Sequence, residues 1–286
     1  PVTTRLTVTK HVEEGNAKPP VNATFTFKLT VGSGEQYYKD VNITPSTPST
    51  NVERKANNEW TFTLKANDSV NISGIRLNDT DVKVEEVIND DHYTTKYSVN
   101  GGTETPGTEA AVTNLLQTGN TVDFTNTYNV PNLKSMTIKK VVTGAFGERT
   151  KEFTFSVTLT KDGAKVIGVN HTNQNGANVT DLSNFTLKHG QQVTLEEISI
   201  GTTITITESN ANDYKTKATN YEVNSDKEFI YVVVADENGN AVLKSKDNNQ
   251  TVAGNAIIVT NDFDGNPDTG VLLDTLPYLI LLAVAV

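Results

Sequence analysis

Apolar and polar residues alternate along most of this chain. Such alternation, in segments rich in Val, Thr, Ile, Phe and Tyr, is typical of β-strands, whose successive side chains point to opposite faces. The clearest segments are Phe25 to Val31, Trp60 to Leu64, Thr203 to Glu208 and Phe229 to Val234. Because no long stretch has apolar residues at the i, i+3 and i+4 spacing of a helix, the pattern predicts an all-β protein.

The second half of the chain repeats the first. Phe25-Thr26-Phe27 recurs as Phe153-Thr154-Phe155, and Phe62-Thr63-Leu64-Lys65 recurs as Phe185-Thr186-Leu187-Lys188. The copies drift in offset by only a few residues, as differences in loop length would produce.

The boundary between the halves falls near Pro131, because proline interrupts a continuing strand. We therefore expect two β-sandwich domains in series, residues 1–130 and 131–263, followed by a C-terminal segment of residues 264–286.

Each half places three unusual polar residues at the ends of alternating apolar runs. In the same order, they are Lys10, Glu86 and Asn126 in the first half and Lys140, Glu208 and Asn261 in the second. Their spacing from the apolar residues predicts that they project into a core, where a lysine or glutamate is costly unless paired or neutralised. The repetition indicates chemistry. The alternative for each residue is an edge strand facing solvent, and for Glu86 a one-residue slip would exchange it with Glu85.

A lysine, an asparagine and a glutamic acid enclosed by apolar side chains can react with one another. Desolvation lowers the pKa of the amine and raises that of the carboxyl, so a neutral nucleophile meets a protonated acid. We expect the acid to bond the amide oxygen, polarise its carbon and pass on the proton that ammonia needs to leave. Because contact gives the reactants a high effective concentration, the reaction needs no cofactor. Its product is a Lys–Asn isopeptide bond.

Each lysine lies on the first strand of its half and each asparagine on the last. A bond between them would close a loop of more than a hundred residues, which the chain-entropy model values at roughly 4.7 kcal/mol. Tension applied at the two ends would pass through the bond and leave most of the sandwich unloaded. The expected function is therefore mechanical.

Composition narrows the function further. The chain has no cysteine, which excludes thiol catalysis, disulfides and cysteine-type zinc sites. Its formal net charge of −10 argues against nucleic acid as a partner. The four histidines are scattered and form no ligand set, so no metal and no cofactor is expected.

Several segments resemble known surface proteins. Thr4 to Lys10 and Met136 to Gly144 look like the first strands of isopeptide domains in Gram-positive pilins, and Phe124 to Asn126 and Val259 to Asn261 resemble their closing strands. The chain is similar over essentially its whole length to backbone pilins of the FctA type. The resemblance implies tandem immunoglobulin-like sandwiches, sortase-built fibres and autocatalytic bonds. By position it assigns the bonds Lys10–Asn126 and Lys140–Asn261, with Glu86 and Glu208 as the catalytic acids.

The C-terminal segment resembles a sortase sorting signal of the LPXTG-like kind. Its residues are Asn266, Pro267, Asp268, Thr269 and Gly270, with Asn266 in place of the usual leucine, and sortase would cut after the threonine. The apolar run that follows, residues 271–286, is shorter than the roughly 20 residues that span a bilayer, so we expect a transient membrane segment cut short. The alternatives are a β-turn in a linker and a terminal core element. At the other end, Pro1 is not an initiator, so we expect any signal peptide to have been removed or not included.

A pilin polymer also needs an acceptor lysine on the next subunit. The position that the resemblance implies is Gly119 here, and no lysine occurs between Gly101 and Asn126. Lys134, in the segment between the halves, is the candidate acceptor by proximity.

Together these features predict a secreted, cell-wall-anchored or pilus-forming surface protein of a Gram-positive bacterium. Its expected partners are sortase and other pilin subunits or peptidoglycan, and it would crosslink itself once without turning over external substrates. The main alternative is a wall-anchored adhesin whose sandwiches bind a host or matrix ligand. A hydrolytic enzyme is disfavoured because no Ser/His/Asp or paired-carboxylate signature is present.

Overall fold

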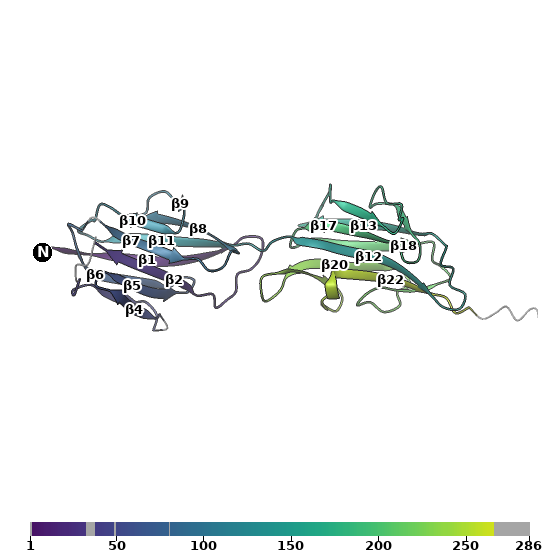
Figure 1. Ribbon diagram of the computed structural model, residues 1–286, viewed down its shortest axis with the longest axis horizontal. Coiled ribbons are helices and arrows are strands. Elements are labelled where there is room, and N and C mark those ends of the chain that lie inside the picture. The colour runs from purple at the N-terminus through teal and green to yellow at the C-terminus, as the bar shows by residue number, and fades with distance from the viewer. Residues whose placement is uncertain (1, 33–37, 49, 80, 266–286) are drawn as a thin grey trace, which may run out of the picture. The chain divides into compact units, whose positions relative to one another are not determined.

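The described part of the chain consists mainly of β-strands, as the alternating pattern predicted (Figure 1). The computed structural model describes residues 2–32, 38–48, 50–79 and 81–265. They form two compact units, one of residues up to 131 with 235–240, the other of residues 132–234 with those from 241 onward. Each unit is a sandwich of two sheets.

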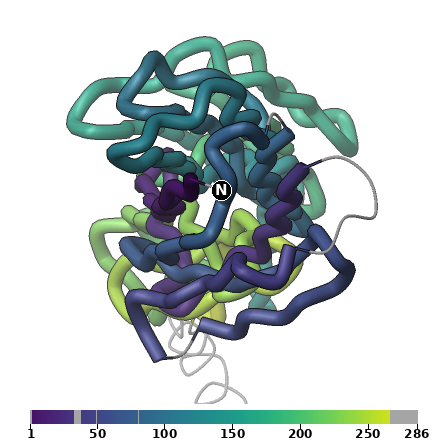
Figure 2. Tube along the Cα trace, turned by 90° about the vertical axis from the view of Figure 1, so that its left-hand side faces the viewer, coloured from purple at the N-terminus to yellow at the C-terminus, as the bar shows by residue number. Residues whose placement is uncertain are grey.

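The larger sheet of the first unit holds the N-terminal strand and the last strand of the sandwich. In spatial order it consists of β3 (Asn42–Pro45), β6 (Ser69–Arg76), β1 (Thr3–Glu14), β11 (Asn120–Tyr128), β8 (Tyr93–Val99) and β9 (Thr105–Pro106). The opposing sheet consists of β10 (Glu109–Val112), β7 (Val82–Val87), β2 (Phe25–Val31), β5 (Glu59–Leu64) and β4 (Val52–Ala56). Figure 2 looks from the N-terminal side and shows β1, in purple, among the other strands of this unit.

The second unit repeats this plan. One sheet consists of β15 (His171–Gln174), β17 (Gln192–Ile198), β12 (Leu133–Thr143), β22 (Ala256–Asp262) and β19 (Lys215–Lys217). The other consists of β14 (Ala164–Lys165), β13 (Phe153–Lys161), β18 (Thr203–Ser209), β20 (Glu228–Ala235) and β21 (Ala241–Ser245), with β16 (Phe185–Leu187) paired to β13.

The first and last strands of each sandwich lie side by side. β1 pairs with β11 in parallel, and β12 pairs with β22 in parallel, whereas the other pairings of the described strands are antiparallel. Parallel neighbours cannot be joined by a tight hairpin. The first and last strands of each sandwich are therefore far apart in sequence, with the other strands between them, but are direct neighbours in the sheet.

The cores follow from the alternation. Along β2 every second side chain is buried, and Phe27 stacks on Phe62 at 5.5 Å between ring centroids. The repeat places Phe155 on Phe185 in the same way, at 5.7 Å. Full burial of each such ring stabilises the fold by about 1.5–3 kcal/mol. The repeated Phe-Thr-Phe segments are thus the centres of the two cores.

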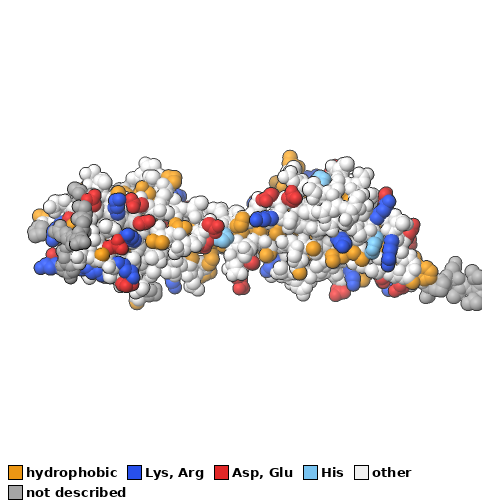
Figure 3. All heavy atoms as spheres, viewed as in Figure 1, with side chains coloured by type: hydrophobic (Ala, Val, Ile, Leu, Met, Phe, Trp, Pro, Cys, Tyr) orange, Lys and Arg blue, Asp and Glu red, His pale blue; other side chains and the backbone are white. Residues whose placement is uncertain are grey.

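The only helical element among the described residues is a single 3-10 turn, Ala253–Asn255. No helix in this part of the chain has the length and apolarity needed to cross a membrane. On the face drawn in Figure 3, acidic and basic side chains are interspersed, and neither sign gathers into a large patch.

Candidate functional site

Strand pairing places Lys10 and Asn126 on one face of the same sheet. Lys10 of β1 lies opposite Phe124 of β11, and Asn126 follows two positions later, so all three side chains point inward. Lys140 lies opposite Val259 with the same two-residue offset to Asn261. All four polar side chains have an exposed fraction of 0%. The lysine and the asparagine therefore have the same relative position on the parallel strand pair in both sandwiches.

The glutamate of each trio comes from the opposing sheet. Glu86 of β7 pairs with Phe27, and Glu208 of β18 pairs with the repeat-equivalent Phe155. Both are buried, with 1% and 3% of their surface exposed, whereas Glu85 is partly exposed. The pairing of β7 with β2 thus turns Glu86, and not its neighbour, toward the core.

Glu86 contacts both other members of the first trio. Its Oε2 lies 3.1 Å from Lys10 Nζ, and its Oε1 accepts a hydrogen bond of 2.5 Å from Asn126 Nδ2. The carboxylate therefore orients the amine and the amide from opposite oxygens.

The second trio is similar but not identical. Lys140 Nζ lies 2.6 Å from Glu208 Oε1, and the same oxygen accepts a hydrogen bond of 2.9 Å from Asn261 Nδ2. Glu208 Oε2 has no hydrogen-bond partner although it is buried. One oxygen thus gathers both partners and leaves the other free to take a proton.

Burial moves the titration of both pairs in the direction that the sequence led us to expect. Desolvation lowers the pKa of Lys10 and of Lys140 from 10.5 to about 8, against the opposing attraction of the adjacent carboxylates. Desolvation also raises the pKa of Glu86 and Glu208 above the ordinary carboxyl value. The two changes reduce the cost of transferring a proton from the ammonium to the carboxylate.

Aromatic rings cover the amines, a feature that we did not derive from the sequence. Lys10 Nζ lies 4.5 Å from the centroid of Phe25, and Lys140 Nζ lies 4.4 Å from that of Phe153. Each ring is in turn held edge-on by a tyrosine, Tyr93 at 5.1 Å and Tyr214 at 5.2 Å. The sequence signal for it was the repeated Phe-Thr-Phe motif, whose first ring follows Lys10 by 15 residues and Lys140 by 13 residues. The rings keep water away from the amine, and their faces attract the amine while it is charged.

The arrangement has the parts that a nucleophilic substitution at the amide requires: an amine of lowered pKa, a buried carboxyl group and a carboxamide. One detail differs from the expected hydrogen bond to the amide oxygen. In both trios the glutamate faces the amide nitrogen, because an ionised carboxylate can only accept hydrogen bonds. The carboxyl group therefore faces the leaving group.

The remaining candidate residues lie apart from the trios. Lys134 is an exposed residue near the start of β12, and Gly119 precedes β11 without a side chain to offer. The proposed sorting signal, residues 266–270, and the apolar run 271–286 lie outside the described residues.

Among the described residues one acidic cluster has donors close enough for a metal ion. Atoms of Asp90, Asp91 and His92 lie within 4.8 Å of one another. The cluster is mostly exposed, and His92 Nδ1 already lies 2.5 Å from Asp90 Oδ1. These contacts are those of a turn.

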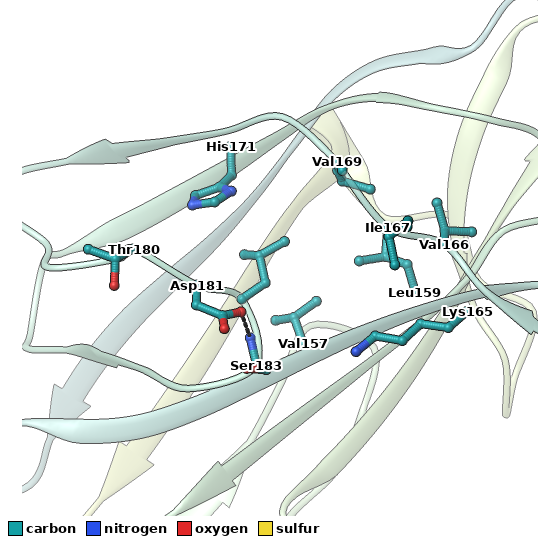
Figure 4. A pocket seen from close by; sticks show the side chains of 12 residues that line it. Val157, Leu159, Lys165, Val166, Ile167, Val169, His171, Thr180, Asp181 and Ser183 are labelled. Carbon is teal, nitrogen blue, oxygen red and sulfur yellow. Dashed lines mark hydrogen bonds between the residues drawn. The ribbon is translucent and has the colours of Figure 1, made fainter.

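A pocket of about 390 Å³ opens in the second sandwich (Figure 4). None of the residues that line it belongs to a trio. Val157 and Leu159 form its floor, and Ile167, His171 and Asp181 lie around it. Asp181 accepts a hydrogen bond from the Ser183 amide at 2.8 Å, so this carboxylate is engaged in its own loop.

Fold and site define a class of protein: tandem β-sandwiches, each with a buried trio of a lysine on the first strand, an asparagine on the last strand and a glutamate on the opposing sheet. Comparison with known families agrees with the division of the chain into two similar sandwiches. The family described as "Domain of unknown function (DUF7601)" matches residues 4–128 and again residues 134–255. The chain therefore belongs to this family and carries two copies of its domain.

Curated relatives add a second level. The chain is 26% identical to a protein named Pilin from Streptococcus pyogenes serotype M1, over 99% of this chain and 88% of the relative. It is 38% identical to the Pilus tip adhesin Cpa of Streptococcus pyogenes, over 30% of this chain and only 13% of that protein. The resemblance to Gram-positive pilins that the sequence suggested is confirmed by these relatives.

Two solved structures are similar at lower identity. The major pilin protein T3.2 of Streptococcus pyogenes is 20% identical over 92% of this chain and 99% of that one, with a TM-score of 0.33. The pilus-presented adhesin Cpa is 19% identical over 57% of this chain and 36% of that one, with a TM-score of 0.35. At these values the two structures add nothing to the family assignment.

Proposed function

We propose that this chain is a structural subunit of a Gram-positive surface pilus or cell wall, stabilised by two autocatalytic Lys–Asn isopeptide bonds. Lys10 would bond to Asn126 and Lys140 to Asn261. Glu86 and Glu208 would relay the protons. The reaction occurs once within each sandwich, so the chain acts on itself and not on an external substrate.

The reaction balances without a co-reactant. Proton transfer from the lysine to the glutamate leaves a neutral amine, whose nitrogen lone pair attacks Cγ of the asparagine. The carbonyl electron pair moves to Oδ1, and the glutamic acid protonates Nδ2. The electron pair on Oδ1 then re-forms the carbonyl as the C–N bond of the carboxamide breaks and ammonia leaves. The regenerated glutamate takes the second proton from Nζ, so the products are a neutral Nζ–Cγ amide, ammonia and a protonated glutamic acid.

One observation carries this proposal: the same three groups are buried twice in contact, on the first strand, the last strand and the opposing sheet. A buried ion pair offers little stability on its own, since its desolvation costs about as much as the attraction returns. Two such pairs, each beside an amide, are better accounted for by a reaction.

Intact-mass spectrometry tests the proposal directly. We expect the full chain to be lighter than its sequence by two ammonia molecules, and tryptic digestion to yield two branched peptides joined through Lys10 and Lys140. A mass equal to that of the plain sequence contradicts the proposal.

Attachment by sortase is the second part of the proposal. It is supported by the Pro-x-Thr-Gly sequence of residues 267–270, which directly precedes the apolar run of residues 271–286. Incubation of the chain with a class of sortase that accepts this sequence should cut it after Thr269. A ladder of covalent oligomers that disappears in Lys134→Ala would identify the acceptor, with Lys139→Ala as the control.

An adhesive role is the second candidate, and the relative named Pilus tip adhesin Cpa favours it over a segment of 88 residues. An adhesin would have the same crosslinks, so mass spectrometry cannot separate the two roles. Binding of the purified chain to a host-glycan or matrix-protein array, absent for a heat-unfolded sample, would support adhesion.

A further inference from the structure

Each trio has a fourth neighbour that the internal repeat also preserves. Across the antiparallel pair β8–β11, Thr95 lies directly opposite Asn126, and across β19–β22, Thr216 lies directly opposite Asn261. Directly opposite residues in an antiparallel pair present their side chains on the same face. Both threonines therefore stand beside the carboxamide that the lysine is to attack.

The backbone hydrogen bonds show that both Thr–Asn pairs are non-hydrogen-bonded pairs, the kind in which the side chains of an antiparallel ladder lie closest. The Thr95 carbonyl accepts a bond of 3.0 Å from the Gly107 amide, and the Thr216 carbonyl accepts one of 2.9 Å from the Asn224 amide. Both acceptors thus point away from the asparagine strand, which makes each Thr–Asn pair a non-hydrogen-bonded one. In such pairs the Cα atoms approach to about 4.5 Å and the side chains lie closest.

The polar atoms of these pairs are left unsatisfied in the ground state. Thr95 Oγ1 and Thr216 Oγ1 are buried without a hydrogen-bond partner, and so are Asn126 Oδ1 and Asn261 Oδ1. A buried polar atom without a partner costs about 1–3 kcal/mol, and such atoms are few in native folds. Finding a donor and an acceptor unsatisfied on adjacent residues, in both sandwiches, is difficult to attribute to packing alone.

We propose that the Thr95 and Thr216 hydroxyls donate a hydrogen bond to Oδ1 of the facing asparagine as the lysine attacks, and so stabilise the developing oxyanion. This inference rests on the proposed crosslinking. The glutamate is bonded to Nδ2, so it does not serve Oδ1, and the threonine supplies the missing donor on the other side of the carboxamide. A donor aimed at the position where charge develops contributes to the transition state more than to the ground state.

A merely structural threonine would behave in the opposite way on substitution. Replacing an unsatisfied buried hydroxyl by the equally shaped valine removes a desolvation penalty, so Thr95→Val should keep or raise the stability of the uncrosslinked sandwich. The same change removes the donor, so it should slow bond formation. Increased stability with a decreased rate is the signature of the proposed role.

The test follows crosslinking in the full chain during cell-free synthesis, with samples quenched in acid at intervals and weighed intact. Thr95→Val should slow the loss of ammonia from the first sandwich by about 10²-fold, the usual effect of removing one oxyanion donor. The loss of ammonia from the second sandwich should be unchanged. Thr216→Val should do the reverse. Thr95→Ser and Thr216→Ser, which keep the hydroxyl, should restore the rate. The controls are Thr94→Val, next to Thr95, and Thr260→Val, next to Asn261, because both side chains lie on the opposite face of the sheet.

The outcomes separate this inference from the proposal beneath it. If the wild-type chain loses no ammonia, the crosslinking itself is contradicted. If it loses two and both valine variants lose theirs at the wild-type rate, the threonine inference alone is overturned. Should valine impair folding, as seen by circular dichroism, the pair Thr→Ser and Thr→Ala decides: equal rates overturn the inference, and a slow alanine variant supports it.

Discussion

Asn126 and Glu86 are joined by a hydrogen bond of 2.5 Å across the interior of the first sandwich, although they come from opposite sheets. The same carboxylate lies 3.1 Å from the Lys10 amine. One side chain from the facing sheet therefore orients both groups of the parallel strand pair. In the proposed reaction this carboxylate also carries the proton between them, so its removal should prevent bond formation and leave folding possible.

We expect Glu86→Ala and Glu208→Ala each to restore the mass of one ammonia molecule to the chain, and the double variant to restore both. Without the carboxyl, the amine has no proton acceptor and the leaving amide no donor. Intact-mass spectrometry of the purified variants measures this. Glu85→Ala, which changes the partly exposed neighbour, is the control. Retention of both bonds in Glu86→Ala would show that the glutamate is dispensable.

The aromatic cover of the amine can be tested at Phe153, whose ring centroid lies 4.4 Å from Lys140 Nζ. Phe153→Leu thins the apolar cover, so water should reach the amine and the pKa of Lys140 should rise toward its ordinary value. Each unit of that rise reduces the neutral amine about tenfold and should slow the second bond in proportion. Timed mass spectrometry measures the rate. Phe185→Leu, which alters a ring stacked on Phe155, is the packing control and should have little effect.

An uncrosslinked variant should show an unusual dependence of stability on pH. In Asn126→Ala the amine of Lys10 stays free, and its pKa in the folded chain is about 8 instead of 10.5. The folded state then binds that proton more weakly than the unfolded state, so the variant gains stability as the pH rises from about 8 to 10.5, by about 3 kcal/mol. The raised pKa of Glu86 acts in the opposite direction and adds stability on acidification.

Urea unfolding at several pH values measures this dependence. The double variant Asn126→Ala with Lys10→Met lacks the amine and should lose the gain between pH 8 and 10.5, which separates the contribution of Lys10 from that of other titrating groups. A gain of the same size in both variants would assign it elsewhere.

The bond itself should stabilise each sandwich separately. Closing the loop from Lys10 to Asn126 is worth about 4.7 kcal/mol in the chain-entropy model, so Asn126→Ala should lower the free energy of unfolding of the first sandwich by about that amount at neutral pH. Asn261→Ala should do so for the second sandwich alone and serves as the reciprocal control. Calorimetry of the two variants should show one lowered transition each, and an unchanged thermogram would contradict the entropic contribution.

The sequence was informative where the physical cost of a residue is high, and silent where it is low. A lysine, a glutamate and an asparagine at apolar positions of strands are conspicuous, because burying them demands a partner, and their repetition identified the trios. The choice between Glu86 and Glu85 needed the pairing of β7 with β2, a long-range register that local alternation does not specify.

Thr95 was missed for a different reason. Threonine is a common strand residue, and nothing local distinguishes Thr95 from the adjacent Thr94. Its position opposite Asn126 depends on how two strands far apart in sequence align. Phe25 and Phe153 were recognised as repeated residues, but their distance to the amines depends on the packing of one sheet on the other.

Pulling experiments are the most direct test of the proposed mechanical function. When the chain is pulled from its two ends, the bonds should carry the load from the first strand to the last, so the residues between each lysine and its asparagine should not extend. Lys140→Ala removes one bond and should add an unfolding event of about 400 Å, at roughly 3.4 Å per residue for the released loop. Lys139→Ala, on the opposite face of the same strand, should leave the trace unchanged. Because extension is read in each molecule, a wild-type chain that releases both loops at moderate force would exclude the bonds even if its unfolding temperature were high.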